Sequence, residues 1–393
     1  MKFEKLTELI DERITGEWGQ EPNSSGVKVI RTTNFTNEGK LDLSNVVERD
    51  IEEKKIEKKA LRKGDIIIEK SGGGPTQPVG RVVFFDVDSD ENYLCNNFTT
   101  ILRPKSNLVD SKYLLYQMLY LHKVGKTKKY QNKTTGIHNL NLEKYLQEKV
   151  PLPPLPDQHH IANLLSKAEN LIAQRKESIR LLDESLKSTF LEMFGDPVRN
   201  EKGWNIGKFK DLAILDRKQV LPSDFTKEDF YIGLEDIEKE TGNIIKISSE
   251  NAEDLKSSKF RFTSNHILYA KLRPYLNKVA LPYQSGICST DIFPVLPLEG
   301  KSNKFFICYL MRSKPFVTEM HSKSSGANLP RASASVIENF KTYQPPIKLQ
   351  AQFAQIVEKT ESLKTQYQQS LQELENLYGS LSQKAFRGEL AKK

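Results

Sequence analysis

Residues 153–171, PPLPDQHHIANLLSKAENL, recur in altered form 192 positions later, as PPIKLQAQFAQIVEKTESL at residues 345–363. The pairs that coincide without any gap include Gln158/Gln350, Ala162/Ala354, Lys167/Lys359 and Glu169/Glu361. A fainter upstream match, at a shift of 193, pairs Cys95 with Cys288 and Pro104 with Pro297. The chain therefore carries one plan twice, a globular half followed by a long helix. Such a duplication suits a target that is itself in two parts.

Composition sets broad limits on the class of protein. The 393 residues include 59 Lys and Arg against 51 Asp and Glu, a net charge of +8 that favours a polyanionic partner. No apolar run approaches the ~18–20 residues that cross a bilayer, and the first residues, MKFEKLTELIDERI, lack a signal-peptide core. Cys95, Cys288 and Cys308 have no metal-binding spacing. We therefore expect a cytoplasmic protein with buried thiols and no membrane contact.

The globular halves contain signals for strands. Residues 28–102 hold VKVIRTTNF, GDIIIEK, GRVVFFDV and CNNFTTIL, which are β-branched or aromatic runs separated by Gly, Pro and Asn. Residues 111–123 predict a short amphipathic helix. The second half repeats this order, with strands in NHILYAKL and GICSTDIFPVL and a helix in FFICYLMRS.

A long helix follows each globular half. Residues 151–158, PLPPLPDQ, predict an extended lead-in in which Asp157 caps a helix from His159 to about Phe194. In the second half the predicted helix runs from Ala351 to about Phe386. We expect domains at residues 1–150 and 198–343, with helical spacers at 151–197 and 344–393.

Both helices show a seven-residue period. In the first, the period is carried by Leu165, Ile172, Ile179, Leu186 and Met193. In the second, it is carried by Val357, Leu371 and Tyr378, with Lys364 as an interruption. Two apolar stripes of this kind are typical of a coiled-coil seam, so we expect the helices to pair antiparallel as a spacer. The alternative is that they are two core helices packed in separate domains.

Motifs for catalysis are missing. The sequence contains neither GxxxxGK[ST] nor a GxGxxG that opens a helix. Prolines follow Gly72–Gly74 and exclude the helix that a phosphate site requires, so we expect a turn between strands there, with close approach to a ligand as the minor alternative. Asp65, Glu69 and Lys70 loosely resemble a nuclease triad, but adjacent residues of a strand face opposite sides. His159 and His160 are likewise adjacent and cannot form a ligand pair. We therefore expect no catalytic residue and no metal site in this chain.

Cationic loops recur at equivalent places in the two halves. The first, residues 124–136, contains Lys126, Lys128, Lys129, Tyr130, Lys133 and Thr134 and no acidic residue. Its counterpart, residues 321–335, contains Lys323, Ser324, Asn328 and Arg331. Side chains of these types neutralise phosphates and present hydrogen-bond donors to base edges. Each loop taken alone could equally be a solvated surface, but recurrence favours a functional interpretation.

The ends of predicted strands supply further candidates for DNA binding. In the first half these are Arg31, Thr33 and Asn34, with Lys70 and Ser71 after GDIIIE. In the second half they are Lys271, Arg273 and Tyr275 of AKLRPY. Because Arg273 precedes a proline, we expect an extended backbone from which its guanidinium projects.

Several motifs resemble the specificity subunit of type I restriction–modification systems. They are TGEWG at Thr15, LRKGDIIIEKSGG at Leu61, VPLPPLPDQHHIANLL at Val150, FLEMFGDP at Phe190 and KAFRGEL at Lys384. The resemblance covers nearly the whole chain. It implies an α+β fold of two mixed α/β target-recognition domains related by pseudo-twofold symmetry, joined by two long antiparallel helices that form a coiled-coil spacer.

The resemblance also implies a function without catalysis in this chain. Each recognition domain would read one half of a split site in double-stranded DNA, and the helices would dock two adenine-methyltransferase subunits. Those subunits would bring S-adenosylmethionine, and the endonuclease subunits of the full complex would bring ATP and Mg. The halves diverge strongly (GDIIIEKSGGG against NHILYAKLRPY), which implies an asymmetric site.

The sequence leaves two other functions open. The first is a coiled-coil scaffold or adaptor whose globular halves bind protein. The second is a stand-alone methyltransferase, but the sequence lacks the glycine-rich cofactor loop and the (N/D)PP(Y/F) tetrapeptide of such enzymes.

Overall fold

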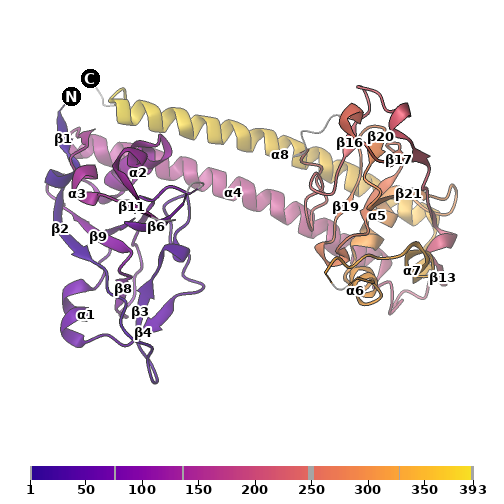
Figure 1. Ribbon diagram of the computed structural model, residues 1–393, viewed down its shortest axis with the longest axis horizontal. Coiled ribbons are helices and arrows are strands. Elements are labelled where there is room, and N and C mark those ends of the chain that lie inside the picture. Colours follow the sequence, from indigo (N-terminus) through magenta and orange to yellow (C-terminus); the bar gives the residue numbers. More distant parts are fainter. Residues whose placement is uncertain (1, 75–76, 135–136, 247–251, 327, 391–393) are drawn as a thin grey trace. The chain divides into compact units, whose positions relative to one another are not determined.

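The computed structural model describes residues 2–74, 77–134, 137–246, 252–326 and 328–390. The chain divides into two compact units. Unit 1 comprises Met1–Gln174 and Leu371–Lys393, and unit 2 comprises Arg175–Ser370. The long helices α4 (Leu155–Phe194) and α8 (Ile347–Arg387) each contribute a segment to both units (Figure 1). Each unit is therefore a globular half completed by one segment of each helix.

Unit 1 is built from small sheets and short helices. Its largest sheet is antiparallel, in the order β2 (Ile10–Thr15), β9 (Thr99–Pro104), β5 (Ile66–Glu69), β7 (Val82–Phe84). A second sheet has the order β4 (Val47–Arg49), β3 (Val27–Ile30), β8 (Tyr93–Cys95). A third has the order β10 (Gln131–Thr134), β11 (Ile137–Leu140), β6 (Ser71–Gly73), and β1 (Phe3–Lys5) pairs with β12 (Lys149–Pro151). The helices are α1 (Glu53–Lys59), α2 (Ser111–Lys123) and α3 (Leu142–Tyr145).

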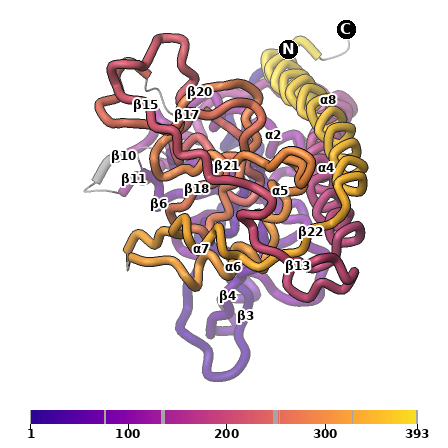
Figure 2. The backbone as a smooth tube through the Cα atoms, turned by 90° about the vertical axis from the view of Figure 1, so that its right-hand side faces the viewer, coloured from indigo at the N-terminus to yellow at the C-terminus, as the bar shows by residue number. Residues whose placement is uncertain are grey.

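Unit 2, which faces the viewer in Figure 2, is also built from small sheets and short helices. Its antiparallel sheet has the order β14 (Ala213–Leu215), β21 (Ile292–Pro297), β18 (Ile267–Ala270), β19 (Val279–Ala280). A second sheet has the order β15 (Gln219–Val220), β17 (Lys259–Phe262), β20 (Gly286–Cys288), β16 (Tyr231–Ile232), and β13 (Asn205–Lys208) pairs with β22 (Lys341–Gln344). The helices are α5 (Lys304–Arg312), α6 (Lys314–Ser322) and α7 (Ala334–Glu338).

The predicted internal repeat is confirmed by the topology. The order β2–β9–β5–β7 in unit 1 returns as β14–β21–β18–β19 in unit 2. Cys95 ends β8, which pairs parallel with β3, and Cys288 ends β20, which pairs parallel with β16. Pro104 and Pro297 each end the second strand of the large sheet. The shift of 193 residues therefore relates strands that occupy the same place in the two units.

A buried glutamine near the start of each long helix fastens that helix to the globular half that precedes it. Gln158 Oε1 accepts a hydrogen bond from the backbone N–H of Asp110, the N-cap of α2, at 2.8 Å. Gln350 Oε1 accepts one from Asn303, the N-cap of α5, at 2.9 Å. Gln158 Nε2 donates to the carbonyls of Pro153 and Leu108. Gln350 Nε2 likewise donates to those of Pro345 and Lys301. The glutamine that recurs in both copies of the repeated sequence therefore satisfies three backbone groups in each half.

The α4 and α8 segments lie side by side within each unit (Figure 1). In unit 2 the Arg175 guanidinium lies 4.3 Å from the ring centroid of Tyr367. Further along, the rings of Phe190 and Phe353 are 5.5 Å apart. Residue numbers thus rise along α4 as they fall along α8, so the two segments run antiparallel, as the heptads predicted.

The predicted seam residues occupy the covered faces of the helices. Leu165, Leu186 and Val357 are buried, and Ile172, Ile179, Met193, Leu371 and Tyr378 are half-buried. Leucines outside the series, Leu171, Leu181 and Leu377, are instead 49–50% exposed. The seven-residue period therefore identified the apolar seam of each helix.

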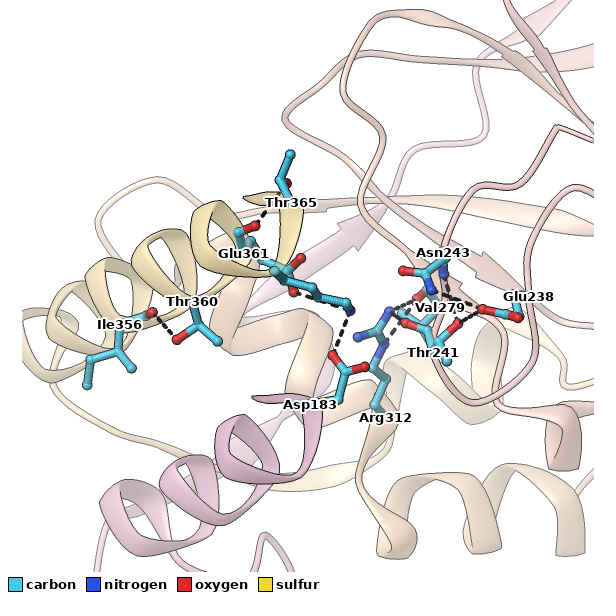
Figure 3. Close-up of polar contacts among 11 residues, drawn as sticks. Asp183, Glu238, Thr241, Asn243, Val279, Arg312, Ile356, Thr360, Glu361 and Thr365 are labelled. Carbon is cyan, nitrogen blue, oxygen red and sulfur yellow. Dashed lines mark hydrogen bonds and ion pairs between the residues drawn. The ribbon is translucent and has the colours of Figure 1, made fainter. Parts of the chain in front are cut away.

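Lys364, which interrupts the apolar series, is buried and paired. Its Nζ lies 2.6 Å from Asp183 Oδ1 on α4 and 3.9 Å from Glu361 Oε1 on its own helix (Figure 3). Beside them, Arg312 donates hydrogen bonds to the carbonyls of Thr241 and Val279. The interruption is therefore a buried ion pair between the helices of unit 2, next to a second polar network.

Both long helices begin four residues earlier than the sequence indicated. The first begins at Leu155, so Asp157 lies in its first turn and the prediction that Asp157 caps it was wrong. The second begins at Ile347 rather than Ala351. The reason is that the first turn of a helix needs no N–H donor, so Pro156 fits there and the proline-rich lead-in becomes helical.

The prediction of a turn at Gly72–Gly74 was also wrong in part. Gly72 and Gly73 belong to β6, which pairs with β11 through Gly73 opposite His138. A Cβ on Gly73 would lie 2.5 Å from Val79 Cγ1, and Gly72 has a φ of +108°. Glycine is therefore needed here for backbone geometry and close packing within the chain.

The three cysteines are buried free thiols. Cys95, Cys288 and Cys308 are free and buried, as predicted. Burial raises the pKa of the Cys95 thiol to about 11, so the thiol stays protonated near neutral pH.

In the described ranges, no helix has the length and apolarity to cross a membrane, and no group of three or more His, Cys, Asp or Glu residues could hold a metal ion.

Candidate nucleic-acid interface

A buried ion pair organises the end of β5 in unit 1. Glu69, the last residue of β5, accepts hydrogen bonds from Arg81 Nε at 3.0 Å and Nη2 at 2.9 Å. Arg81 Nη2 also donates to the carbonyl of Thr32 at 3.1 Å. The turn that holds Arg31, Thr33 and Asn34 is thereby tied to the strand end that leads into Lys70 and Ser71.

Within that turn, the three predicted residues differ in how far they are available to a ligand. Asn34 is buried: its Oδ1 accepts from the Arg31 amide at 2.9 Å, and its Nδ2 donates to the carbonyls of Asp42 and Asn45. Arg31 Nη2 donates to the Asn45 carbonyl at 3.0 Å. Thr33 is exposed. The Asn34 amide therefore shapes the loop, and Thr33 presents its hydroxyl to solvent.

Lys70 and Ser71 follow the strand end and are both half-buried. Their backbone N–H groups donate to the carbonyl of Phe98, at 2.8 Å and 3.2 Å. Burial lowers the pKa of Lys70, and no carboxylate pairs with its ammonium group in the part of the chain that the structure describes. The ring of Phe98 is 49% exposed. An aromatic ring and an unneutralised cation thus share this edge.

The basic loop of unit 1 folds as the 3₁₀ helix Lys126–Tyr130 and the start of the β10–β11 hairpin. Lys128 and Lys129 are exposed, whereas Lys126 Nζ lies 3.9 Å from Glu148. The Tyr130 hydroxyl donates to Glu148 at 2.6 Å, and this contact raises the pKa of Tyr130 to about 12. The predicted side chains of Lys133 and Thr134, in β10, lie outside what the structure describes. Because β11 pairs with β6, this loop is attached directly beside Lys70 and Ser71.

At the corresponding strand end of unit 2, the prediction that Arg273 has an extended backbone was wrong. Arg273 has φ +50° and ψ +66°, the left-handed region, and precedes the 3₁₀ helix Pro274–Leu276. Its N–H donates to the Pro330 carbonyl at 2.7 Å, and its carbonyl accepts from Leu276 at 2.9 Å. These contacts hold a conformation that is unfavourable for a residue with a Cβ. The side chain of Arg273 is nevertheless exposed, as predicted.

The Asp291 carboxylate lies between two other cations of this edge, Arg331 and Lys271. Asp291 accepts from Arg331 through two oxygens, from Nε at 3.0 Å and Nη2 at 3.2 Å. Lys271 Nζ lies 3.7 Å from the same carboxylate and 4.8 Å from the ring centroid of Phe293. This pairing raises the pKa of Arg331 further above its ordinary value. The predicted residues Lys271 and Arg331 are thus brought together, although 60 positions apart in sequence.

The remaining candidates of unit 2 surround this edge. Tyr275 is 45% exposed, and its ring contacts that of His321 edge-on at 5.2 Å between centroids. Lys323 is exposed and pairs with Glu319 at 2.7 Å. The Ser324 hydroxyl donates to the His321 carbonyl at 2.7 Å. Asn328 is exposed, next to residue 327, which lies outside the described residues.

The two basic loops attach to equivalent strand ends. In unit 1 Asn139 of β11 lies opposite Ser71, and in unit 2 Arg331 lies opposite Leu272 in an isolated bridge. A second bridge joins Arg331 to Ser325. The loop at residues 321–335 is therefore fixed beside β18 as the loop at residues 124–136 is fixed beside β5.

Two of the three nuclease-like residues, Asp65 and Glu69, form salt bridges within the fold. Asp65 accepts two hydrogen bonds from Arg103, each at 2.9 Å, and both side chains are buried. Glu69 is neutralised in the same way by Arg81. Both carboxylates are therefore used in salt bridges within the fold.

Sequence reasoning missed Arg81, Phe98 and Asp291. Arg81 and Asp291 act through partners that are distant in sequence, which no local pattern reveals. Phe98 could be singled out only together with Asp291, its match under the shift of 193 that relates Cys95 to Cys288.

Comparisons with known proteins agree with this architecture. The family model of the type I restriction modification DNA specificity domain matches the chain twice, over residues 5–181 and 201–376. The EcoDI specificity subunit of Escherichia coli is 27% identical over 191 residues, which are 48% of this chain and 42% of that protein. The MjaVIII specificity subunit of Methanocaldococcus jannaschii is 24% identical over 287 residues, 67% of this chain and 66% of that protein. The chain thus spans between two fifths and two thirds of these relatives' own lengths.

A solved structure shares the fold over nearly the full chain. The crystal structure of the type I restriction-modification system S subunit from M. genitalium has a TM-score of 0.56 at 15% identity, and covers 98% of this chain and 96% of its own. A second structure, described as the basis of complex assembly in the type I R-M system, has a TM-score of 0.53 at 14% identity, with 99% and 98% covered. Because the family model matches both halves of the duplicated sequence, this chain belongs to the family of type I restriction–modification DNA specificity proteins.

Proposed function

We propose that this chain is the sequence-specific DNA-binding subunit of a type I restriction–modification complex. Unit 1 would read one half of a bipartite site in double-stranded DNA, and unit 2 would read the other half. The observation that carries the proposal is that each unit attaches a basic loop to the end of the same strand, β5 or β18. Two related readers on one chain suit a target with two parts.

The proposed site is asymmetric because the two edges differ in chemistry. Unit 1 offers the exposed lysines of its loop, Lys128 and Lys129, with a paired hairpin beside them. Unit 2 offers Arg273, with Arg331 held by a carboxylate. Lysine acts mainly as a point charge toward phosphate, whereas arginine gives directional hydrogen bonds, often to guanine. Different base sequences in the two half-sites are the expected result.

The proposal extends to the complex. The outer faces of the helices, where Leu171, Leu181 and Leu377 are half exposed, would dock two adenine-methyltransferase subunits. Those subunits would bind S-adenosylmethionine, and endonuclease subunits would bind ATP and Mg. This chain would position the partners on DNA and would take no part in the chemistry.

The salt dependence of DNA binding tests the proposal. Replacing Lys128 and Lys129 with alanine should weaken binding of duplex DNA and lower the slope of log K against log salt by about two, since each lost phosphate contact removes about one unit. The control replaces Lys167 and Lys384, two exposed lysines of the unit 1 helix segments, with alanine. It removes the same charge, and its slope should stay that of the wild type.

The binding assay uses the full chain and a random duplex at several salt concentrations. Equal slopes in both double variants would mean that the loop is only a solvated surface. Failure of the wild-type chain to bind duplex DNA at low salt would instead favour a scaffold whose globular halves bind protein.

A further inference from the structure

One position of the fold holds a phenylalanine in unit 1 and an aspartate in unit 2. The Lys70 N–H donates to the Phe98 carbonyl at 2.8 Å, and the Lys271 N–H donates to the Asp291 carbonyl at 2.9 Å. Strand register gives the same equivalence, because Glu69 lies opposite Thr99 and Ala270 lies opposite Ile292. Phe98 in unit 1 and Asp291 in unit 2 therefore occupy the same place, immediately before β9 and β21.

In unit 2 the carboxylate at this position fixes the cations around it. Two oxygens of Asp291 hold the Arg331 guanidinium through Nε and Nη2, which leaves Nη1 to donate elsewhere. Nη1 is 3.4 Å from the carbonyl of Leu329 in the same loop, a weak contact. An arginine whose plane is fixed by a carboxylate presents its remaining donors in one direction.

In unit 1 the same position is apolar and lies beside the cation of Lys70. Phe98 exposes 49% of its surface, and the half-buried ammonium of Lys70 pairs with no carboxylate among the described residues. A charge that is partly removed from water without a partner is unfavourable, and an anion bound beside it would relieve that cost. The neighbouring carboxylate, Glu69, is already taken by Arg81.

We propose that this position contacts the target base pairs in both units and makes them read different bases. In unit 1 the Phe98 ring would make an apolar contact with a base, such as a thymine methyl group in the major groove, while Lys70 holds an adjacent phosphate. In unit 2 Asp291 is a positioning residue, which aims Arg331 at the acceptors of a guanine. Phenyl rings against the thymine methyl and arginine against guanine O6 and N7 are established pairings of side chain and base. This inference rests on the proposed function.

Base preferences measured on randomised duplexes test the inference. The variants are Phe98→Ala and Asp291→Asn in the full chain, with Phe3→Ala as control, because Phe3 is a 53% exposed phenylalanine of unit 1 on strand β1. Phe98→Ala should weaken binding to the selected site about tenfold and relax the preference at one position of one half-site. Asp291→Asn should relax one position in the other half-site. Phe3→Ala should behave as the wild type.

Several outcomes distinguish a failure of this inference from a failure of the proposed function. If the wild type selects a bipartite site and Phe98→Ala selects it with unchanged affinity and preference, the inference is overturned and the function stands. If both variants relax the same half-site, it is also overturned. Neither replacement removes a backbone hydrogen bond, and the melting temperature and circular dichroism of each variant would verify that it folds. A wild type that selects no sequence would overturn the proposed function itself.

Discussion

Exchanging residues 198–344 for the equivalent segment of another specificity subunit should change one half of the recognised sequence and leave the other half intact. The segment carries the globular part of unit 2, including both strands of the β13–β22 pair, whose register joins Asn205 to Gln344. Its core is separate from that of unit 1: Phe262, Phe306 and Phe316 are buried within unit 2. Because each unit has its own core and its own basic loop, the units should recognise DNA independently.

The exchange preserves contacts that the chimera needs in order to fold. The donor segment must present a backbone N–H to Gln350, which accepts from Asn303 in this chain, and a hydroxyl in place of Tyr343, which donates to the Gly195 carbonyl at 2.9 Å. Sequencing of methylated sites in cells that carry the chimera measures the outcome. Loss or change of both half-sites together in a folded chimera would show that the units are not separate readers.

Removal of Asp183 should destabilise unit 2 far more than removal of its partner Lys364. Lys364 is 4% exposed, so Asp183→Ala leaves a buried ammonium whose remaining salt bridge among the described residues is the long one to Glu361, at 3.9 Å. Leaving such a charge unpaired costs about 3 kcal/mol. Lys364→Met instead leaves Asp183, whose side chain is 30% exposed and can be hydrated, and methionine fills the same volume in the seam. We expect a cost below about 1 kcal/mol for this variant.

The double variant completes the cycle. Asp183→Ala with Lys364→Met should recover most of the stability, because no unpaired charge remains buried. Amide hydrogen exchange in the unit 2 segments of α4 and α8 measures the free energy of opening directly. Equal losses in the two single variants, with no recovery in the double variant, would mean that side-chain packing rather than the ion pair holds this part of the seam.

Much of the fold was predictable because its signals are local or periodic. The heptads of α4, from Leu165 to Met193, placed the covered face correctly, and the repeat placed Gln158 and Gln350 at equivalent points. The helix starts were missed because proline is compatible with the first turn. Lys364 was interpreted only as a break in the apolar series, because its partner Asp183 lies 181 positions away in the sequence.

The candidate interface was less predictable. Composition singled out the two basic loops, and sheet pairing places them beside Lys70 and Lys271 at the ends of corresponding strands. Composition could not show that the Asn34 amide is consumed by its own turn, or that Arg331 is held by Asp291. Those properties depend on contacts between distant segments, which one sequence does not display.

The most direct test of a bipartite DNA reader is the methylated sequence itself. Genomic DNA would be sequenced for methylated adenine in cells with and without the gene for this chain, in the presence of its methyltransferase partner. A bipartite reader should give a motif that depends on the gene and consists of two different specified halves separated by unspecified bases. A motif that is continuous or palindromic, or methylation that is unchanged when the gene is removed, would contradict it.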